Sequence, residues 1–402
     1  AKLPPGLIAL GRTLTADQAG ISDALVNTDK NNFSPRVGFA WRPGGDDRTV
    51  VRGGFGLFHP TVAVQGVRDL LATNEFRYYE DYRGASRFMK MADAFTTGVP
   101  FVDPTAFGNQ GIIPDIQSPD VYQYNLTLER EIGGNMGLRL SYIGSTMRNL
   151  LTDSDYNILK PNTESFGWDE ASFERLPSYP YGRYRDIVGN NGAAQLHALQ
   201  AGLTRRWRNG LAFDVVYTYA DSDSTVPDSG NSSIGVVLYN PWEPDSDKGP
   251  DINVVKHRVV ANATWDLPFG KNRKYGSNMP GWADALFGGW TVSTIFQARS
   301  GLNLTPFFSG YYSYNPWNTA KPLDGLGNWF CCAWRPDVTG DPNTPQTRDQ
   351  WFDQSAYSIP GPGQFGNAKK GSLEGPGTWI VNFSVFKDIV AKDRFRLQLT
   401  AL

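Results

Sequence analysis

The spacing of strand-like segments constrains this chain more than any single motif does. Ten segments in which apolar and polar residues alternate fall into five pairs, each joined by a short turn. The pairs are 35–43 with 49–60, the hairpin 122–145 around GGN (133–135), 195–207 with 211–222, 255–270 with 288–301, and 378–390 with 393–402. Between the pairs lie connections of about 60, 50, 30 and 75 residues, unusually long for a compact domain.

This regular alternation of connection lengths indicates a particular architecture. In an antiparallel meander every second connection lies at the same end of the sheet, so the short turns gather at one end and the long loops at the other. Outer-membrane barrels have this asymmetry, with short turns on one side and long extracellular loops on the other. The spacing therefore predicts an all-β, antiparallel transmembrane β-barrel, present in part as about ten strands, with long extracellular loops.

Side chains on a strand alternate between two faces, and each predicted strand has one apolar and one polar face. A barrel turns the apolar face to lipid and the polar face to the lumen. The residues expected to face lipid are Tyr124, Leu126, Leu128, Leu138, Leu140, Phe213, Val215, Tyr217, Val381, Phe383, Phe395 and Leu397. The residues expected to face the lumen are Gln123, Asn125, Glu129, Arg139, Asp214, Thr218, Asn382 and Ser384. A sandwich or propeller core is the competing explanation for the aromatic residues.

Charge and hydropathy exclude two classes of protein. Basic and acidic residues nearly balance, at 38 and 40, so the composition implies no nucleic-acid partner. The sequence contains no apolar run of the roughly 20 residues that a membrane-spanning helix needs, which argues against a helical membrane bundle.

Candidate chemistry is sparse. Two acidic clusters in one expected loop, 220–231 and 243–251, offer carboxylates that could bind calcium, although neither matches an EF-hand and solvated turns are the simpler explanation. The calcium candidates are Asp221, Asp223, Asp228, Asp245, Asp247 and Asp251. The adjacent Cys331 and Cys332 cannot form a CxxC zinc site, and no GxSxG or phosphate-loop motif occurs. We therefore expect no enzyme activity, no catalytic residue and no cofactor.

Several stretches resemble one family. NNFSPRVGFAW (31–41) followed by TVVRGGFGLFHP (49–60) is similar to the start of the barrel in Oar-like TonB-dependent transporters of the acidobacterial type. YQYNLTLEREIGGNMGLRLSYIGS (122–145) and LQAGLTRRWRNGLAFDVVYTYADS (199–222) echo the same pattern. WFDQSAYSIPGPGQFGNAKKGSLEGPG (351–377) looks like the family's late loop, before a strand similar to its VNFSVFKD.

This resemblance implies a 22-stranded, plugged barrel in the outer membrane, energised through TonB. The chain starts at Ala1 without Met and ends at Leu402 inside a strand-like run, so we expect a fragment of one barrel domain. Residues 1–32 would precede the barrel strands of 33–402, and the plug and N-terminal domains would lie upstream. The implied partners are outer-membrane lipid, the TonB complex through that missing region, and an extracellular ligand such as an oligosaccharide, a peptide or a metal chelate.

Three alternatives to a TonB-dependent transporter stay open. Within the membrane, a passive porin or an adhesion or secretion barrel would show the same strand pattern. Outside it, a secreted, soluble, carbohydrate-active β protein could use carboxylates from 220–251. The sequence of the loops does not name a ligand.

Overall fold

A computed structural model describes most of the chain. The described residues are 26–61 without 46, 109–155, 185–226, 238–307 without 272, 335–391 without 359 and 361–364, and 395–401, together with Asp17, Gly20 and Ser22. The calcium candidate Asp228 and the two cysteines, Cys331 and Cys332, lie outside these ranges.

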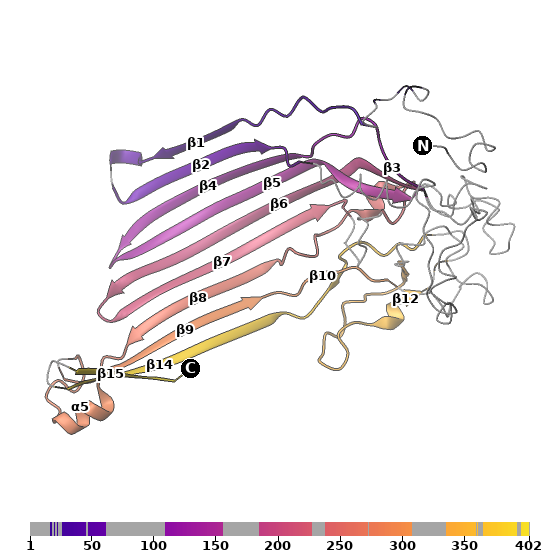
Figure 1. Cartoon of the computed structure of the whole chain (residues 1–402). Helices are drawn as coiled ribbons and strands as arrows, with labels where there is room; N and C mark the ends of the chain where they lie inside the picture. Colours follow the sequence, from indigo (N-terminus) through magenta and orange to yellow (C-terminus); the bar gives the residue numbers. More distant parts are fainter. Residues whose placement is uncertain are drawn as a thin grey trace, which may run out of the picture.

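One large antiparallel sheet dominates the structure (Figure 1). Its strands follow one another in chain order, each hydrogen-bonded to the next. They are β1 (Arg36–Trp41), β2 (Thr49–Phe58), β4 (Asp120–Gly133), β5 (Met136–Asp155), β6 (Arg185–Arg208), β7 (Leu211–Ser224), β8 (His257–Asp266), β9 (Trp290–Arg299), β14 (Thr378–Ala391) and β15 (Phe395–Ala401). A short strand, β3 (Asn109–Ile112), pairs in parallel with the first residues of β6. The predicted antiparallel meander is confirmed.

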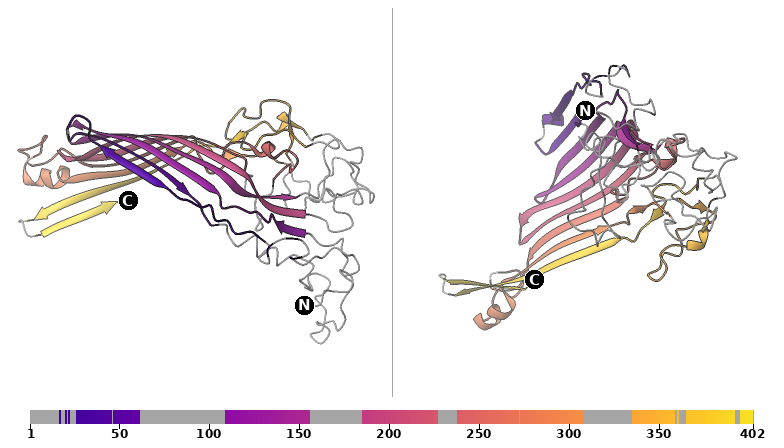
Figure 2. Two further views of the ribbon diagram at one scale, coloured as in Figure 1. Left: turned by 90° about the horizontal axis from the view of Figure 1, so that it is seen from above. Right: turned by 45° about the vertical axis from the view of Figure 1, so that its right-hand side comes forward.

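The two ends of the sheet differ as the connection lengths predict. The short connections lie at one end, where η1 (Pro43–Gly45) follows β1 and α5 (Gly281–Phe287) precedes β9, while the long connections lie at the other end (Figure 1). The sheet is curved but open, because within the described residues β1 pairs only with β2 and β15 only with β14 (Figure 2). The described helices are short, and none has the length and apolar character needed to cross a membrane.

Local backbone geometry explains the tight turns at the short end. Asn209 and Gly210 form the two-residue connection between β6 and β7, with φ of 53° and 78°. Two successive positive φ values define the type I′ turn, whose twist matches that of a hairpin and which favours Asn-Gly. The GGN turn between β4 and β5 likewise has positive φ at Gly133, Gly134 and Asn135.

The strands β5 and β6 are longer than the sequence pattern indicates. The expected segments end at 145 and begin at 195, whereas β5 continues to Asp155 and β6 begins at Arg185. The register between them shifts at Met147, Leu150 and Thr152, and Asn149 has a φ of 56°. Such irregularities break the two-residue period, so the extension has no clean alternation in sequence.

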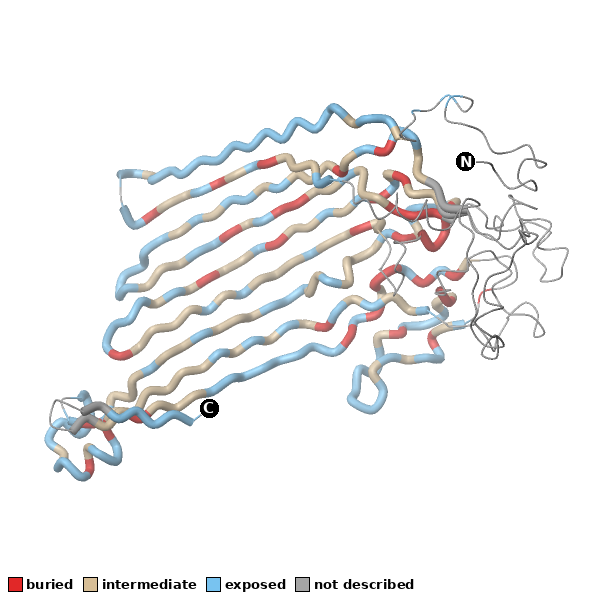
Figure 3. Tube along the Cα trace, in the orientation of Figure 1, coloured by how far each residue is buried: buried red, intermediate tan, exposed pale blue. Residues whose placement is uncertain are grey.

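Beyond the sheet, described parts of the long connections form a unit that we call the loop cluster, made up of residues 238–256, 301–307 and 335–377 without 359 and 361–364. It contains two small antiparallel sheets, β10 (Asn303–Leu304) with β13 (Leu373–Glu374) and β11 (Asp337–Val338) with β12 (Tyr357–Ser358). It also contains the 3₁₀ turns η4 (Pro244–Asp247) and η6 (Gln354–Ala356). Buried residues are concentrated at this end, while along the strands most positions are partly or fully exposed and buried ones such as Ser141 and Ala198 are scattered (Figure 3).

Candidate functional site: the two faces of the sheet and the loop cluster

The strand register places one uninterrupted apolar row across nine strands. Each member of the row is the direct cross-strand partner of the next, from β1 to β14. In order, the row is Trp41, Val51, Leu128, Leu140, Ala201, Tyr217, Val259, Ala298 and Trp379. No charged residue occurs in it. A face of this composition matches the lipid-facing band of a barrel.

The next row, one residue away on each strand, belongs to the opposite face and is polar. In order, it is Ala40, Arg52, Thr127, Ser141, Gln200, Thr218, Arg258, Arg299 and Thr378. Hydrogen bonds connect several neighbours across the strands: Thr127 Oγ1 to Ser141 Oγ at 2.9 Å, Gln200 Nε2 to Thr218 Oγ1 at 3.3 Å, and Arg299 Nε to Thr378 Oγ1 at 3.0 Å. The two faces therefore differ in chemistry along the whole sheet.

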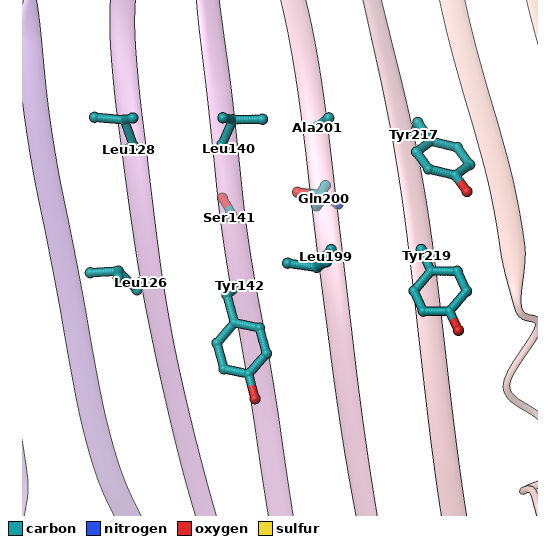
Figure 4. A pocket seen from close by; sticks show the side chains of 10 residues that line it. All are labelled: Leu126, Leu128, Leu140, Ser141, Tyr142, Leu199, Gln200, Ala201, Tyr217 and Tyr219. Atoms are coloured by element: carbon teal, nitrogen blue, oxygen red, sulfur yellow. The ribbon is translucent and has the colours of Figure 1, made fainter.

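Large apolar side chains on the apolar face are exposed. Leu126 has 51% of its surface exposed, Leu199 58% and Trp379 72%, values that a soluble protein avoids over so large an area. Figure 4 shows the centre of this face, a shallow hollow lined by leucine and tyrosine side chains from β4 to β7. An extended apolar surface without a protein covering is suited to contact with lipid.

The strand register shows which of the residues predicted to face lipid or lumen share a face of the sheet. All the lipid candidates from Tyr124 to Phe383 share the apolar face, and Leu397 lies opposite Ile389 on that same face. For Phe395 the structure gives the backbone position alone, directly opposite Ala391 on β14. All eight lumen candidates share the polar face. Which face meets lipid stays a prediction at the level of the individual residue.

The centre of the loop cluster is a buried ion pair. Arg335, 5% exposed, forms a salt bridge with Asp247, which is completely buried. The other Asp247 oxygen accepts a hydrogen bond from the Tyr239 backbone N–H at 2.7 Å, and Arg335 Nη1 donates to the Ser246 carbonyl at 2.7 Å. The guanidinium also lies over the Tyr239 ring, 4.6 Å from its centroid. Satisfied partners on both sides are what a buried ion pair requires.

Tyr239 extends this network to the late loop. Its hydroxyl accepts a hydrogen bond from the Gly366 N–H at 2.9 Å, and its ring packs edge-on against Phe365. Burial raises the pKa of the Tyr239 phenol to about 12. Burial likewise raises the pKa of the Asp247 carboxyl, against the opposing effect of the Arg335 charge.

A buried lysine attaches the loop cluster to the sheet. Lys370, 2% exposed, donates from Nζ to the carbonyl oxygens of Ser224, at the end of β7, and of Val226. The Leu238 N–H donates to the Asp153 carbonyl on β5 at 2.8 Å. Strands β5 and β7 thus support the cluster. Beside the ion pair is a cavity of about 640 Å³ with polar and charged lining.

The calcium candidates do not converge in the described structure. Asp221 and Asp223 lie on β7 rather than in a loop, and Asp223 pairs with Lys248 at 3.5 Å. Asp247 is engaged by Arg335, and the Asp251 carboxylate accepts from the Asn253 N–H at 2.7 Å in a local turn. Within the ranges that the structure describes, no three His, Cys, Asp or Glu residues form a group suited to a metal ion.

Sequence reasoning missed the loop cluster as an ordered unit. Asp247 was identified only as a loop carboxylate, and Arg335 and Tyr239 were not singled out. Arg335 lies 88 residues from Asp247, and Gly366 lies 127 residues from Tyr239, separations at which no local pattern operates. The one available signal was the stretch 351–377, which contains Gly366 and Lys370 and resembles a family loop.

Comparison with solved structures returns transporters and receptors at low similarity. The outer membrane transporter YddB from Escherichia coli has a TM-score of 0.39 and 11% identity over 72% of this chain and 31% of its own. The FrpB iron transporter from Neisseria meningitidis has a TM-score of 0.38 and 10% identity over 91% and 34%. The ferric enterobactin receptor PfeA from Pseudomonas aeruginosa has a TM-score of 0.38 and 11% identity over 89% and 32%. The chain thus spans about a third of the length of each.

The comparison with family models matches a larger part of the chain than the comparison with solved structures does. No curated protein sequence matches the chain. The model of the outer membrane beta barrel domain matches residues 2–401, nearly the whole sequence. With the antiparallel sheet, its apolar face and the separation of turns from loops, this match shows that the chain belongs to the outer membrane β-barrel domain family, in the outer membrane.

Proposed function

We propose that this chain forms part of the wall of a TonB-dependent transporter, which captures an extracellular ligand with its long loops and admits it through a plugged lumen. The observation that carries the proposal is the pair of adjacent rows, apolar and polar, that cross nine strands. In an outer-membrane protein the apolar row faces lipid, so the polar row lines the interior.

The loop end supports capture of a ligand. The buried side chains of Asp247, Arg335 and Lys370 connect the parts of the loop cluster to one another and to the end of β7. A preorganised surface binds at a lower entropic cost than a mobile one. The lining of the adjacent cavity, which includes Glu243, Lys248 and Phe365, suits a ligand with both polar and apolar parts, such as an oligosaccharide, a peptide or a metal chelate.

The choice of a TonB-dependent transporter over a passive porin rests on the resemblance of 31–60, 122–145 and 351–377 to Oar-like transporters. In this proposal the chain acts through binding and gating and catalyses no covalent reaction. The TonB complex would act on a plug and on an N-terminal segment outside these 402 residues.

Conductance of the intact protein in planar lipid bilayers tests this choice. A plugged transporter is expected to pass almost no current until a denaturant such as urea displaces the plug, and to bind the purified C-terminal domain of TonB. A large, steady conductance without urea and without TonB binding would identify a porin instead.

A further inference from the structure

Two arginines stand directly opposite each other on the polar face. Arg258 on β8 and Arg299 on β9 are cross-strand partners, and both are exposed. Directly opposite residues have Cβ atoms about 5 Å apart, and like charges at that position repel. Their outer register neighbours are Thr218 on β7 and Thr378 on β14, both neutral. The pair thus concentrates positive charge between two hydroxyl groups.

Nothing among the described residues neutralises this charge. No carboxylate in the described ranges lies within 4.0 Å of either guanidinium. Within the ranges that the structure describes, the one hydrogen bond from either side chain runs from Arg299 Nε to Thr378 Oγ1 at 3.0 Å, and it does not use the terminal nitrogens of either guanidinium. Lys256, two residues before Arg258 in the chain and just outside β8, is a further exposed cation.

Arg52, in the same row, differs from this pair because a carboxylate of the protein lies beside it. Its Nη1 lies 3.3 Å from the Glu129 carboxylate, so the protein provides its counter-charge. The same row thus contains one arginine with a protein carboxylate beside it and two without. Guanidinium groups bind carboxylate and phosphate in a bidentate manner, and two side by side can hold one oxyanion.

We propose that Arg258 and Arg299 form a binding site for an oxyanion, a carboxylate or phosphate group of a dissolved solute, on the polar face near the loop end of the sheet. The inference rests on the proposed function to the extent that this face lines a lumen reached from the loops. It assigns the transported ligand to the class of anionic solutes, and the charge of the site complements that class.

Inorganic phosphate is the probe, and the intact protein in detergent micelles at low ionic strength is the sample. Phosphate is expected to raise the Tm saturably, and more than chloride at equal ionic strength does. The double variant Arg258→Gln/Arg299→Gln should lose this gain, with phosphate affinity reduced at least about tenfold in a direct titration. The matched control Arg52→Gln, which removes one charge from the same row, should retain it.

A second readout needs no added ligand. If the pair is unneutralised, Arg258→Gln or Arg299→Gln alone should raise the Tm at low salt, because either change relieves the repulsion. Three results would overturn the site. The first is an equal rise in Tm with phosphate and with chloride, and the second is an equal loss of the phosphate effect in Arg52→Gln. The third is a lower Tm in each single variant with no response to phosphate. The last would show that a carboxylate of the protein itself neutralises the pair. A barrel that gates and binds TonB but ignores phosphate would refute this site alone.

Discussion

The sheet and the loop cluster are stabilised by different interactions. Along the sheet, each strand pairs with the next in sequence, and short turns such as Asn209-Gly210 set the register. In the loop cluster the decisive contacts join distant residues. Asp247 and Arg335 are 88 residues apart, and Lys370 reaches a carbonyl 146 residues away on Ser224. One region is built from repeated local pairings, the other from a few long-range contacts.

This difference predicts how the stability of each region responds to a substitution. In the sheet the stabilising interactions are spread over many backbone hydrogen bonds, and most side chains are partly exposed. In the cluster Asp247 and Arg335 provide each other's counter-charge, and a charge left alone in a dry interior is costly. Substitutions should therefore have large, local effects in the cluster and effects in the sheet that depend on the face.

The largest effect is expected from Asp247→Ala, which leaves the Arg335 charge buried without its partner. Removing one member of a buried pair costs about 3–5 kcal/mol. Hydrogen exchange should show the amides of the cluster opening while those of β4 to β7 stay protected. The control is Asp47→Ala, whose partner Arg42 is exposed, with an expected cost of at most about 1 kcal/mol. Similar exchange in both variants would contradict the contrast between the regions.

The second-largest effect is expected from a charge introduced on β7, and it tests which face of that strand meets lipid. Val215→Arg places a charge on the apolar face between Leu203 and Ala261 and should cost about 2–4 kcal/mol if the site is near the bilayer midplane. Thr218→Arg, on the polar face of the same strand, should be tolerated. Refolding into lipid vesicles, followed by urea titration, measures both. The reverse ranking would show that the faces are assigned the wrong way round.

A pH effect of about 2–3 kcal/mol is expected in the loop cluster, because the pKa of Tyr239 is about 12 in the folded protein against an ordinary value of 10.0. Since the pKa is raised on folding, the neutral phenol stabilises the cluster fully below pH 10, and this contribution is lost as pH rises toward 12. Protease protection of the cluster should fall over that window. The variant Tyr239→Phe, which cannot ionise, should lack this part of the decline.

The smallest effect concerns the turn that sets the register of β6 and β7. Gly210 has a φ of 78°, and an added Cβ would lie 3.1 Å from the Asp266 Cβ. Gly210→Ala should destabilise the sheet by about 1–2 kcal/mol through left-handed backbone strain. Gly202→Ala, in the interior of β6, meets nothing closer than 3.6 Å and should be nearly neutral by the same urea titration.

The sequence by itself determined the sheet. The alternation in 211–222 predicts β7, the short GGN turn predicts the hairpin of β4 and β5, and the loop lengths predict which end holds the loops. These features could be read because a strand has a two-residue period and pairs with its neighbour in the chain. Where bulges interrupt that period, as at Asn149, the prediction ends β5 ten residues early.

Tertiary structure alone decided the rest. The sequence presents Asp247 as one more loop carboxylate and Lys370 as one more loop lysine. Folding buries both, to 0% and 2% exposure, and gives them partners from other loops and strands. The same holds for Arg258 and Arg299, whose direct opposition follows from the register of β8 with β9. The alternation of side chains is a property of each strand, whereas burial and charge pairing depend on which segments meet in space.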